Sequence, residues 1–306
     1  MIDFLVYFVT VAAIWSMLGL SLNLQYGLAG LVNLGQIVFF MLGGYASTIL
    51  VKFGGQPFFV GIIAGTLVAA LFGALMALPT ARLQQDYWAI STLAAAEIVR
   101  LIFLNTTIGG PYSGQAFGIS GIPRPLRSEF ADWGFSIADY NLFYMALVLV
   151  LLAVIVVFVA WLMRTPFGRA LKAIREGDAV PLALGKRVSS FRIRAMAIGG
   201  GIGGFAGALF AHYNAYIGPE YFLPVETFLI WAMVIVGGAG NVIGTLVGTV
   251  VIMGISNSTR FIAPLLNIDA QVLGPLRMVV IGALVIVVVM FVPRGLLPET
   301  RTRFDR

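Results

Sequence analysis

The sequence contains no cysteine, which excludes disulfide bonds and thiolate metal sites. Charged residues are also scarce, at 10% of the chain, whereas soluble domains carry about 25%. Hydrophobic residues make up 60%, and the mean hydropathy is +0.98. A chain of this balance cannot cover itself with a water-facing surface. The composition therefore predicts an α-helical protein that crosses a membrane several times.

Sequence motifs for catalysis and energy coupling are missing as well. There is no G-x-x-x-x-G-K-[ST] loop for ATP, no H-E-x-x-H zinc motif, and no pair of carboxylates at metal-ligand spacing. The 13 acidic residues place too few carboxylates inside apolar segments to form a proton relay. We therefore expect a transport pathway without an energy source of its own, and no cofactor or metal site in this chain.

Long apolar segments dominate what is present. A span needs about 20 residues, so 306 residues leave room for about eight to ten crossings. We expect a single all-α transmembrane domain over residues 1–306, with about eight to nine spans, some of them broken at glycine. The start lacks the basic region of a cleaved signal peptide, so we expect the first segment to be retained. The apolar segments are Phe4–Asn23, Leu31–Val51, Phe58–Leu78, Tyr87–Leu104, Leu142–Met163, Ala195–Tyr213, Val225–Val236, Val242–Ile255 and Leu273–Val292.

Two of these segments are too short to span comfortably, and they flank the glycine-rich stretch Gly237–Asn241. Such segments are tolerated at membrane depth only where protein or a water cavity satisfies the backbone. The sequence leaves two alternatives open over Val225–Ile255, namely a helix–turn–helix that dips to one face, or one broken helix.

A basic island over residues 164–194 carries eight of the 19 lysine and arginine residues. The positive-inside rule places such a segment in the cytoplasm. Alternation of the spans then puts Arg82 and a basic tail, residues 293–306, on the same side. Six cations remain on the outer side or at outer helix ends. This solution has the N-terminus outside, the C-terminus inside, and residues 106–141 as a periplasmic loop, for which its aromatics and prolines favour a structured cap.

Capping signals predict two short helices within the island. Arg169–Arg175 can form one, and Asp178 is a good N-cap for a second helix that ends before Gly185. Pro181 would lie in the first turn of that second helix, where proline costs least. Two capped helices favour a rigid docking element over an ordinary basic loop.

The glycine run at residues 199–204 formally contains G-x-G-x-x-G, the fingerprint of dinucleotide binding. That reading needs a preceding strand, whereas an apolar helix surrounds this run. Small residues four apart indicate close helix packing instead. The glycines predicted to pack helices are Gly199, Gly203, Gly207, Gly240, Gly244 and Gly248.

Polar residues inside the apolar segments are candidates for a substrate pathway, because ionisable groups at membrane depth usually face a bundle interior. Glu97 and Arg100 lie one helical turn apart, and they can form a structural ion pair or contact substrate. Asn33 and Gln36 can bond a ligand or a neighbouring helix. His212 lies near an outer helix end, where we expect it to be interfacial. The candidate pathway residues are Asn23, Asn33, Gln36, Glu97 and Arg100.

Several stretches in order along the chain match one known family. The chain resembles the LivM-type permease subunit of branched-chain amino-acid ABC importers. The matching stretches are SLNLQYGLAGLVNLGQIVFFMLGGYAS (Ser21–Ser47), DYWAISTLAAAEIVRLIFLN (Asp86–Asn105), GISGIPRP (Gly118–Pro125), GRALKAIREGDAVPLALG (Gly168–Gly185), AGALFAHY (Ala206–Tyr213) and VPRGLL (Val292–Leu297).

The resemblance implies that Gly168–Gly185 is a coupling element that inserts into a cleft of an ATPase subunit. Pro181 departs from the family pattern, and the outer loop near Gly109–Gly114 is altered. The coupling residues implied are Gly168, Arg169, Ala173, Arg175, Glu176, Asp178, Ala183 and Gly185.

The resemblance also implies the assembly. A second permease subunit would pair with this one in the lipid of the bacterial inner membrane. Two cytoplasmic ATP-binding subunits would bind ATP and Mg, and a periplasmic substrate-binding protein would deliver leucine, isoleucine or valine for alternating access. No nucleic acid is involved. Urea or short-chain amide permeases share much of the pattern and stay open as alternatives, as does a gradient-driven secondary transporter.

Overall fold

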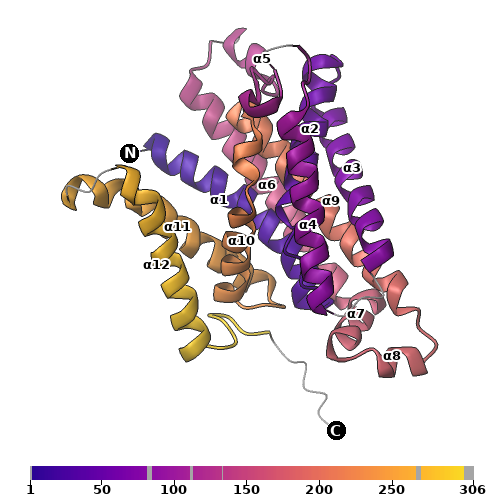
Figure 1. Cartoon of the computed structure of the whole chain (residues 1–306). Coiled ribbons are helices and arrows are strands. Elements are labelled where there is room, and N and C mark those ends of the chain that lie inside the picture. The colour runs from indigo at the N-terminus through magenta and orange to yellow at the C-terminus, as the bar shows by residue number, and fades with distance from the viewer. Residues whose placement is uncertain (1, 81–84, 111–112, 133, 267–269, 300–306) are drawn as a thin grey trace.

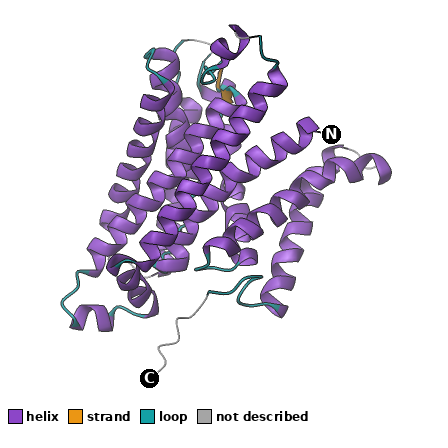
Figure 2. Ribbon diagram, turned by 180° about the vertical axis from the view of Figure 1, so that it is seen from behind, coloured by secondary structure: helices purple, strands orange, loops and turns teal. Residues whose placement is uncertain are grey.

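The computed structural model describes residues 2–80, 85–110, 113–132, 134–266 and 270–299. Most of these residues are helical, as Figure 2 shows. The elements in chain order are α1 (Ile2–Leu22), the π-helical turn η1 (Asn23–Leu28), α2 (Ile37–Thr48), the π-helical turn η2 (Ile49–Phe53), α3 (Phe58–Thr80), α4 (Gln85–Asn105), the 3-10 turn η3 (Gln115–Phe117), β1 (Ile119–Ser120), α5 (Arg127–Asp132), α6 (Ile137–Arg164), α7 (Pro166–Glu176), α8 (Ala179–Ala183), α9 (Val188–Asn214), β2 (Tyr216–Ile217), the 3-10 turn η4 (Pro219–Phe222), α10 (Pro224–Gly237), α11 (Val242–Leu266) and α12 (Ala270–Phe291).

Eight of the nine predicted apolar segments lie in helices to within one residue, whereas Leu31–Val51 starts in a non-helical stretch and is helical only from Ile37. Among the described residues, six helices are long and apolar enough to cross a membrane: Ile2–Leu28, Phe58–Pro79, Asp86–Asn105, Ile137–Arg164, Val188–Asn214 and Gly274–Phe291. Three more apolar helices are shorter: Ile37–Phe53, Pro224–Gly237 and Val242–Asn257. The fold is therefore that of an all-α polytopic membrane protein, as the composition predicted.

The structure decides between the two alternatives for Val225–Ile255. α10 ends at Gly237, and α11 begins at Val242 and packs back along it. A Cβ on Gly237 would lie 2.1 Å from the carbonyl oxygen of Gly244, and one on Gly248 would lie 2.0 Å from that of Met233. Contacts that move apart symmetrically from the turn define an antiparallel pair. The segment is a helix–turn–helix.

The two ends of the bundle carry different parts of the chain. Figure 1 shows α7 and α8 at one end, with the last described residues beside them, and α5 at the opposite end. We call these the island end and the loop end. α11 and α12 lean away from the remaining helices. Arg82 and residues 300–306 of the basic tail, with Arg301, Arg303 and Arg306, lie outside the described residues.

The core forms where α9 packs along α2 and α3. Glycine permits backbone-to-backbone contact there, as expected for helices that associate without a hydrophobic driving force. A Cβ on Gly207 would lie 1.8 Å from the carbonyl oxygen of Phe40, and one on Gly43 would lie 2.0 Å from that of Gly204. Gly203 meets the Phe39 side chain.

Three of the other predicted packing glycines differ in what they contact. Gly199 lies against the Gln25 side chain, and Gly244 lies against the backbone of Gly237. Gly240 lies in no helix, which corrects the packing prediction for it. It occupies the turn between α10 and α11 with φ +84, a left-handed conformation that suits glycine.

The described part of the loop between α4 and α6 forms a cap at the loop end. β1 pairs with β2, which joins the loop to the end of α9. Lys52 donates to the carbonyl oxygen of Ser120, and Tyr140 donates to that of Pro125 at 2.9 Å. His212 is fully buried rather than interfacial, between Ser47 and the Pro123 carbonyl, so that prediction was wrong. Its Nδ1 meets the cap at Pro123, and its Nε2 meets Ser47 of α2.

Candidate functional site

α7 is a helix that begins and ends at residues suited to those positions. Thr165 accepts the N-cap bond from the backbone of Gly168 at 3.3 Å, and Pro166 occupies the first turn. Its inner face packs through Leu171 and Ile174. Gly177, with φ +154, ends it. The predicted helix over Arg169–Arg175 is confirmed.

α8 follows directly and presents an apolar surface. As predicted, Pro181 lies in the first turn of α8, and Gly185, with φ +71, follows the end of the helix. Pro181 is buried. Asp178 occupies the N-cap position, but its carboxylate makes no capping bond to the described backbone. Arg192 of α9 takes that carboxylate instead, at 2.9 and 3.0 Å. A guanidinium offers a stronger, charge-assisted bond than a backbone N–H, so the cap is lost to the ion pair.

The other coupling residues implied by the resemblance share the island end. Gly168 is buried, and a Cβ there would lie 2.4 Å from the Leu162 carbonyl oxygen. The remaining members differ in how far water reaches them. Exposed to water are Arg169, Glu176, Ala183 and Gly185, and half-buried are Ala173, Arg175 and Asp178.

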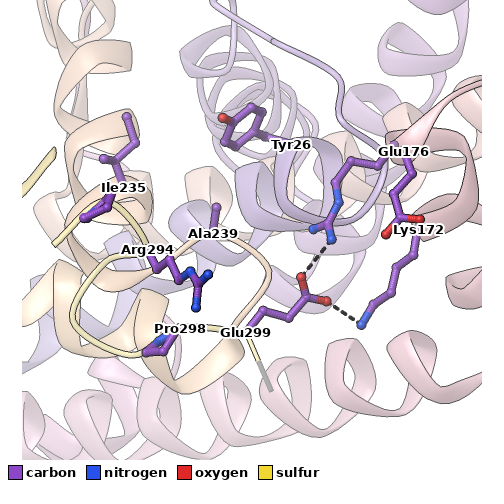
Figure 3. Close-up of a pocket in the computed structure, with 10 residues that line it drawn as sticks. Tyr26, Lys172, Glu176, Ile235, Ala239, Arg294, Pro298 and Glu299 are labelled. Atoms are coloured by element: carbon purple, nitrogen blue, oxygen red, sulfur yellow. Dashed lines mark hydrogen bonds and ion pairs between the residues drawn. The ribbon is translucent and has the colours of Figure 1, made fainter. Parts of the chain in front are cut away.

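Arg175 ties α7 to the membrane domain and to the tail. Its guanidinium donates to the carbonyl oxygen of Gly27 in η1 and to Glu299 at 2.8 Å. Lys172, one turn earlier, reaches the other oxygen of Glu299 at 2.6 Å. Figure 3 shows the two bonds to Glu299. Burial opposes ionisation of Glu299, but the hydrogen bonds from Lys172 and Arg175 outweigh it and lower the pKa of this carboxyl.

A polar cavity of about 810 Å³ opens beside these bonds. Its walls come from η1, α7, α10 and the segment after α12 (Figure 3). Charged side chains of both signs face it, and the aromatic ring of Tyr26 lies at its inner side. The charged lining residues are Lys172, Arg175, Glu176, Arg294 and Glu299.

Residues 29–36, between η1 and α2, form a non-helical loop inside the bundle, and a buried amide network holds it. Asn33 Nδ2 donates to Gln25 Oε1 at 2.7 Å and to Gln36 Oε1 at 2.9 Å. Gln36 Nε2 donates to Ser21 Oγ at 2.6 Å. All four side chains are buried.

Neighbouring helices satisfy the backbone of the same loop. Leu34 N donates to Thr92 of α4 at 3.1 Å, and Trp231 of α10 donates to the Asn33 carbonyl oxygen at 2.9 Å. Ile37 N donates to Thr227 at 3.3 Å. Irregular backbone at membrane depth requires such partners. Asn33 and Gln36 therefore bond neighbouring protein in this conformation, and their contact with a ligand stays a prediction.

Asn23 lies at the island end rather than in the middle of the bundle. Its side chain accepts from Gly240 N at 2.7 Å and donates to the Asn241 carbonyl oxygen at 3.2 Å. It thereby fixes the turn between α10 and α11 against η1.

Glu97 and Arg100 form a closed ion pair on α4, with N–O distances of 2.5 and 2.9 Å. Both side chains remain partly exposed, on a helix that is mostly unburied. Among the five candidate pathway residues, hydrogen bonds join Asn33 to Gln36 and Arg100 to Glu97, while Asn23 bonds the turn between α10 and α11.

Comparison with known proteins now identifies the kind of molecule. Residues 4–289 match the family described as branched-chain amino acid transport system / permease component. The chain belongs to this permease family.

Named relatives agree with the family. The chain is 32% identical to the high-affinity branched-chain amino acid transport system permease protein LivM of Salmonella typhimurium (strain LT2), over 95% of this chain and 69% of that protein. The LivM protein of Escherichia coli (strain K12) gives the same values. The probable branched-chain amino acid transport permease protein LivM of Methanocaldococcus jannaschii is 29% identical, over 94% of this chain and 91% of that protein. No solved structure gave a significant match.

Family membership confirms the resemblance drawn from the sequence. The protein is a multi-pass permease component, a transport subunit rather than an enzyme. The geometry of α7 and α8, and the polar loop that α4 and α10 hold, are accordingly features of a permease.

The sequence did not predict a role for two residues that matter in the structure of the permease, Glu226 and Glu299. Glu226 lies in the first turn of α10, half-buried, and no described residue bonds its carboxylate. Arg277 of α12 is the charged group that acts on it electrostatically. An acid two residues after Pro224 was a signal for a helix start, but the apolar residues around it obscured this signal. Glu299 follows the last apolar segment, and nothing in the sequence indicates which cations it meets.

Proposed function

We propose that the protein forms part of the translocation pathway of an ATP-driven importer for leucine, isoleucine or valine. Family membership and the named LivM relatives support this substrate class. In this proposal the island end faces the cytoplasm, the loop end faces the periplasm, and the membrane is the bacterial inner membrane. The basic residues clustered at the island end favour this orientation.

The surface of α8 is the single observation that carries the coupling role. Val180, Leu182 and Leu184 are 66%, 57% and 72% exposed. They lie at the basic end of the bundle, outside the apolar spans, where lipid cannot cover them. Exposed apolar clusters with a polar rim mark protein-binding surfaces. The partner in this proposal is an ATP-binding subunit, which membership of the permease family supports.

The assembly proposed has two such ATP-binding subunits, which bind the ATP and Mg, and a second permease subunit. The partly exposed Glu97–Arg100 pair supports the latter, since a charged pair at membrane depth is costly against lipid. A periplasmic binding protein would deliver substrate to the cap at the loop end.

Coupling then follows from the contacts of α7. ATP binding would draw the two ATPases together and shift α7, which Arg175 joins to the Gly27 carbonyl at the foot of η1. η1 leads directly into the buried loop 29–36. Nucleotide drives the change only through its different affinity for the two states of the transporter.

Substitutions on the exposed side of the coupling element test this role. Glu176→Lys reverses a charge on the exposed end of α7, and Gly185→Leu forces a side chain into a left-handed backbone position. Both variants should insert normally and hydrolyse ATP with little uptake in proteoliposomes that contain all subunits. Asp3→Lys, an exposed charge reversal at the start of α1, is the control. Normal uptake by both island variants would refute the coupling role.

The rival mechanism and the rival substrates need separate measurements. Uptake by this chain alone in proteoliposomes, driven by an ion gradient without ATP, would establish a secondary transporter. Competition of labelled leucine uptake by isoleucine, valine, urea and acetamide tests the substrate class. Branched-chain amino acids should compete, and competition only by urea or acetamide would indicate a urea or short-chain amide permease.

A further inference from the structure

The chain after α12 does not hang free but crosses the turn between α10 and α11. We call residues Val292–Glu299 the strap. Leu296 N donates to the Val236 carbonyl oxygen at 2.9 Å, and Leu297 N donates to that of Gly237 at 3.0 Å. Asn241 Nδ2 donates to the Pro298 carbonyl oxygen at 3.1 Å. The strap therefore satisfies carbonyl groups that the end of α10 would otherwise leave without partners.

Two glycines make this contact possible. Gly238 and Gly295 have φ values of +117 and +74. A Cβ on Gly295 would lie 2.4 Å from the Gly238 Cα, and a Cβ on Gly238 would lie 2.3 Å from the Leu297 carbonyl oxygen. Backbone here lies directly on backbone, so the strap and the turn move as one piece.

The other end of the strap is bound to the coupling element. Glu299 bonds Lys172 at 2.6 Å and Arg175 at 2.8 Å, as Figure 3 shows. Among the described residues these are the ion pairs that join the strap to α7. Arg175 has two roles in consequence, since the same guanidinium also bonds the Gly27 carbonyl.

We infer that the strap is a second coupling arm, which makes the α10–α11 turn follow α7 when the ATP-binding subunits move it. α10 carries Trp231 and Thr227, both bonded to the segment 33–37 of the buried loop and the start of α2. Movement of α7 thus reaches that loop from two sides, through η1 and through α10. Glu299 is a positioning residue in this arm. The inference rests on the proposed coupling role of α7.

The position of Glu299 separates this role from a structural one. Its pairs with Lys172 and Arg175 are 20–32% exposed at the water-facing end, where ion pairs add little to stability. The backbone bonds of Leu296 and Leu297 hold the strap on the turn without it. Glu299→Gln should therefore leave insertion and thermal stability unchanged while it loosens the link between strap and α7.

The first experiment measures transport per ATP hydrolysed, with all subunits in proteoliposomes. For Glu299→Gln this ratio should fall about fivefold, as expected for losing an exposed charged link. Asp86→Asn removes an exposed acid near the island end of α4 and should keep the wild-type ratio. A wild-type ratio for Glu299→Gln would overturn the inference. No ATP-driven uptake by the wild-type assembly would instead overturn the proposed function.

The second experiment measures the movement itself. The chain has no cysteine, so two spin labels can be placed at Lys186→Cys after α8 and Ile243→Cys at the start of α11, both exposed. With an intact strap, the distance between the labels should be the same with and without nucleotide. In the Glu299→Gln background the distance between the labels should change or broaden when the ATP-binding subunits of the assembly bind ATP. A distance that already varies in the wild type, or that stays fixed without Glu299, contradicts a coupling arm.

Discussion

Gly207→Ala gives the sharpest test of how the helices are packed. The added Cβ would lie 1.8 Å from the Phe40 carbonyl oxygen, whereas ordinary contacts of this kind lie at 3.4–4 Å. α2 and α9 would have to separate by about 1.5 Å at their crossing, in an interior packed as closely as a crystal. Overpacking costs about 1–3 kcal/mol, and a backbone obstacle cannot rotate away, so we expect about 3 kcal/mol.

Gly282→Ala is the matched control for this substitution. Gly282 also lies within an apolar spanning helix, α12, but an added Cβ there meets no described atom within 4 Å. Alanine is a better helix former than glycine by about 1 kcal/mol, so this variant should be neutral or slightly more stable.

Thermal unfolding of the detergent-solubilised protein, followed by size-exclusion chromatography after heating, compares the two variants. At about 2–4 °C per kcal/mol, Gly207→Ala should lower the apparent Tm by about 6–12 °C. Equal apparent Tm values for both variants would refute the close approach of α2 and α9. A lower apparent Tm for Gly282→Ala alone would show that α12 is closely packed at Gly282 and that α9 is not closely packed at Gly207.

Three further predictions concern polar groups. Asn33→Ala leaves buried amide oxygens of Gln25 and Gln36 without their donor, which should cost about 3 kcal/mol in the same unfolding assay; an unchanged Tm would mean that the network does not hold the loop. The pKa of Glu299 is lowered, so its link is present above the ordinary carboxyl pKa of about 4.3 and is lost only as the pH falls through the lower folded-state value. The label distance across the strap should accordingly be the same at pH 7.5 and pH 5, and a change within that window would contradict the ion pair. Glu226→Gln should reduce uptake, because ionisable groups at membrane depth usually serve function, and it should not reduce the amount of inserted protein, because no described residue forms a hydrogen bond or ion pair with its carboxylate; reduced insertion measured by membrane immunoblot would assign it a structural role.

Local patterns sufficed to predict the helices and much of the island. Apolar segment length located all nine apolar helices, and the signals at Pro181 and Gly185 placed α8, because these features depend on neighbouring residues alone. Asp178 was a good N-cap by type, yet Arg192, 14 residues away, outcompeted the backbone for its carboxylate.

Long-range polar partners could not be predicted in the same way. Gln25, Asn33 and Gln36 are polar residues in an apolar sequence, and their spacing fits a ligand site as well as a structural network. The structural partners of the same loop include Trp231 and Thr92, which come from helices far along the chain. The bonds of Glu299 could not be predicted for the same reason, since its partners lie 124 residues or more before it.

The buried loop 29–36 also constrains how the protein is made. Its backbone, together with Ile37 at the start of α2, finds partners in Thr92 of α4 and in Thr227 and Trp231 of α10, which leave the ribosome long after the loop itself. Until α10 is synthesised, the second apolar segment cannot settle at its final depth without unpaired peptide groups in lipid. We therefore expect the second apolar segment to stay near the insertion machinery, or at a shallower depth in the membrane, until α10 is made. A chain that ends before Trp231 should be recognised as unfinished and degraded, although it already holds six of its apolar helices.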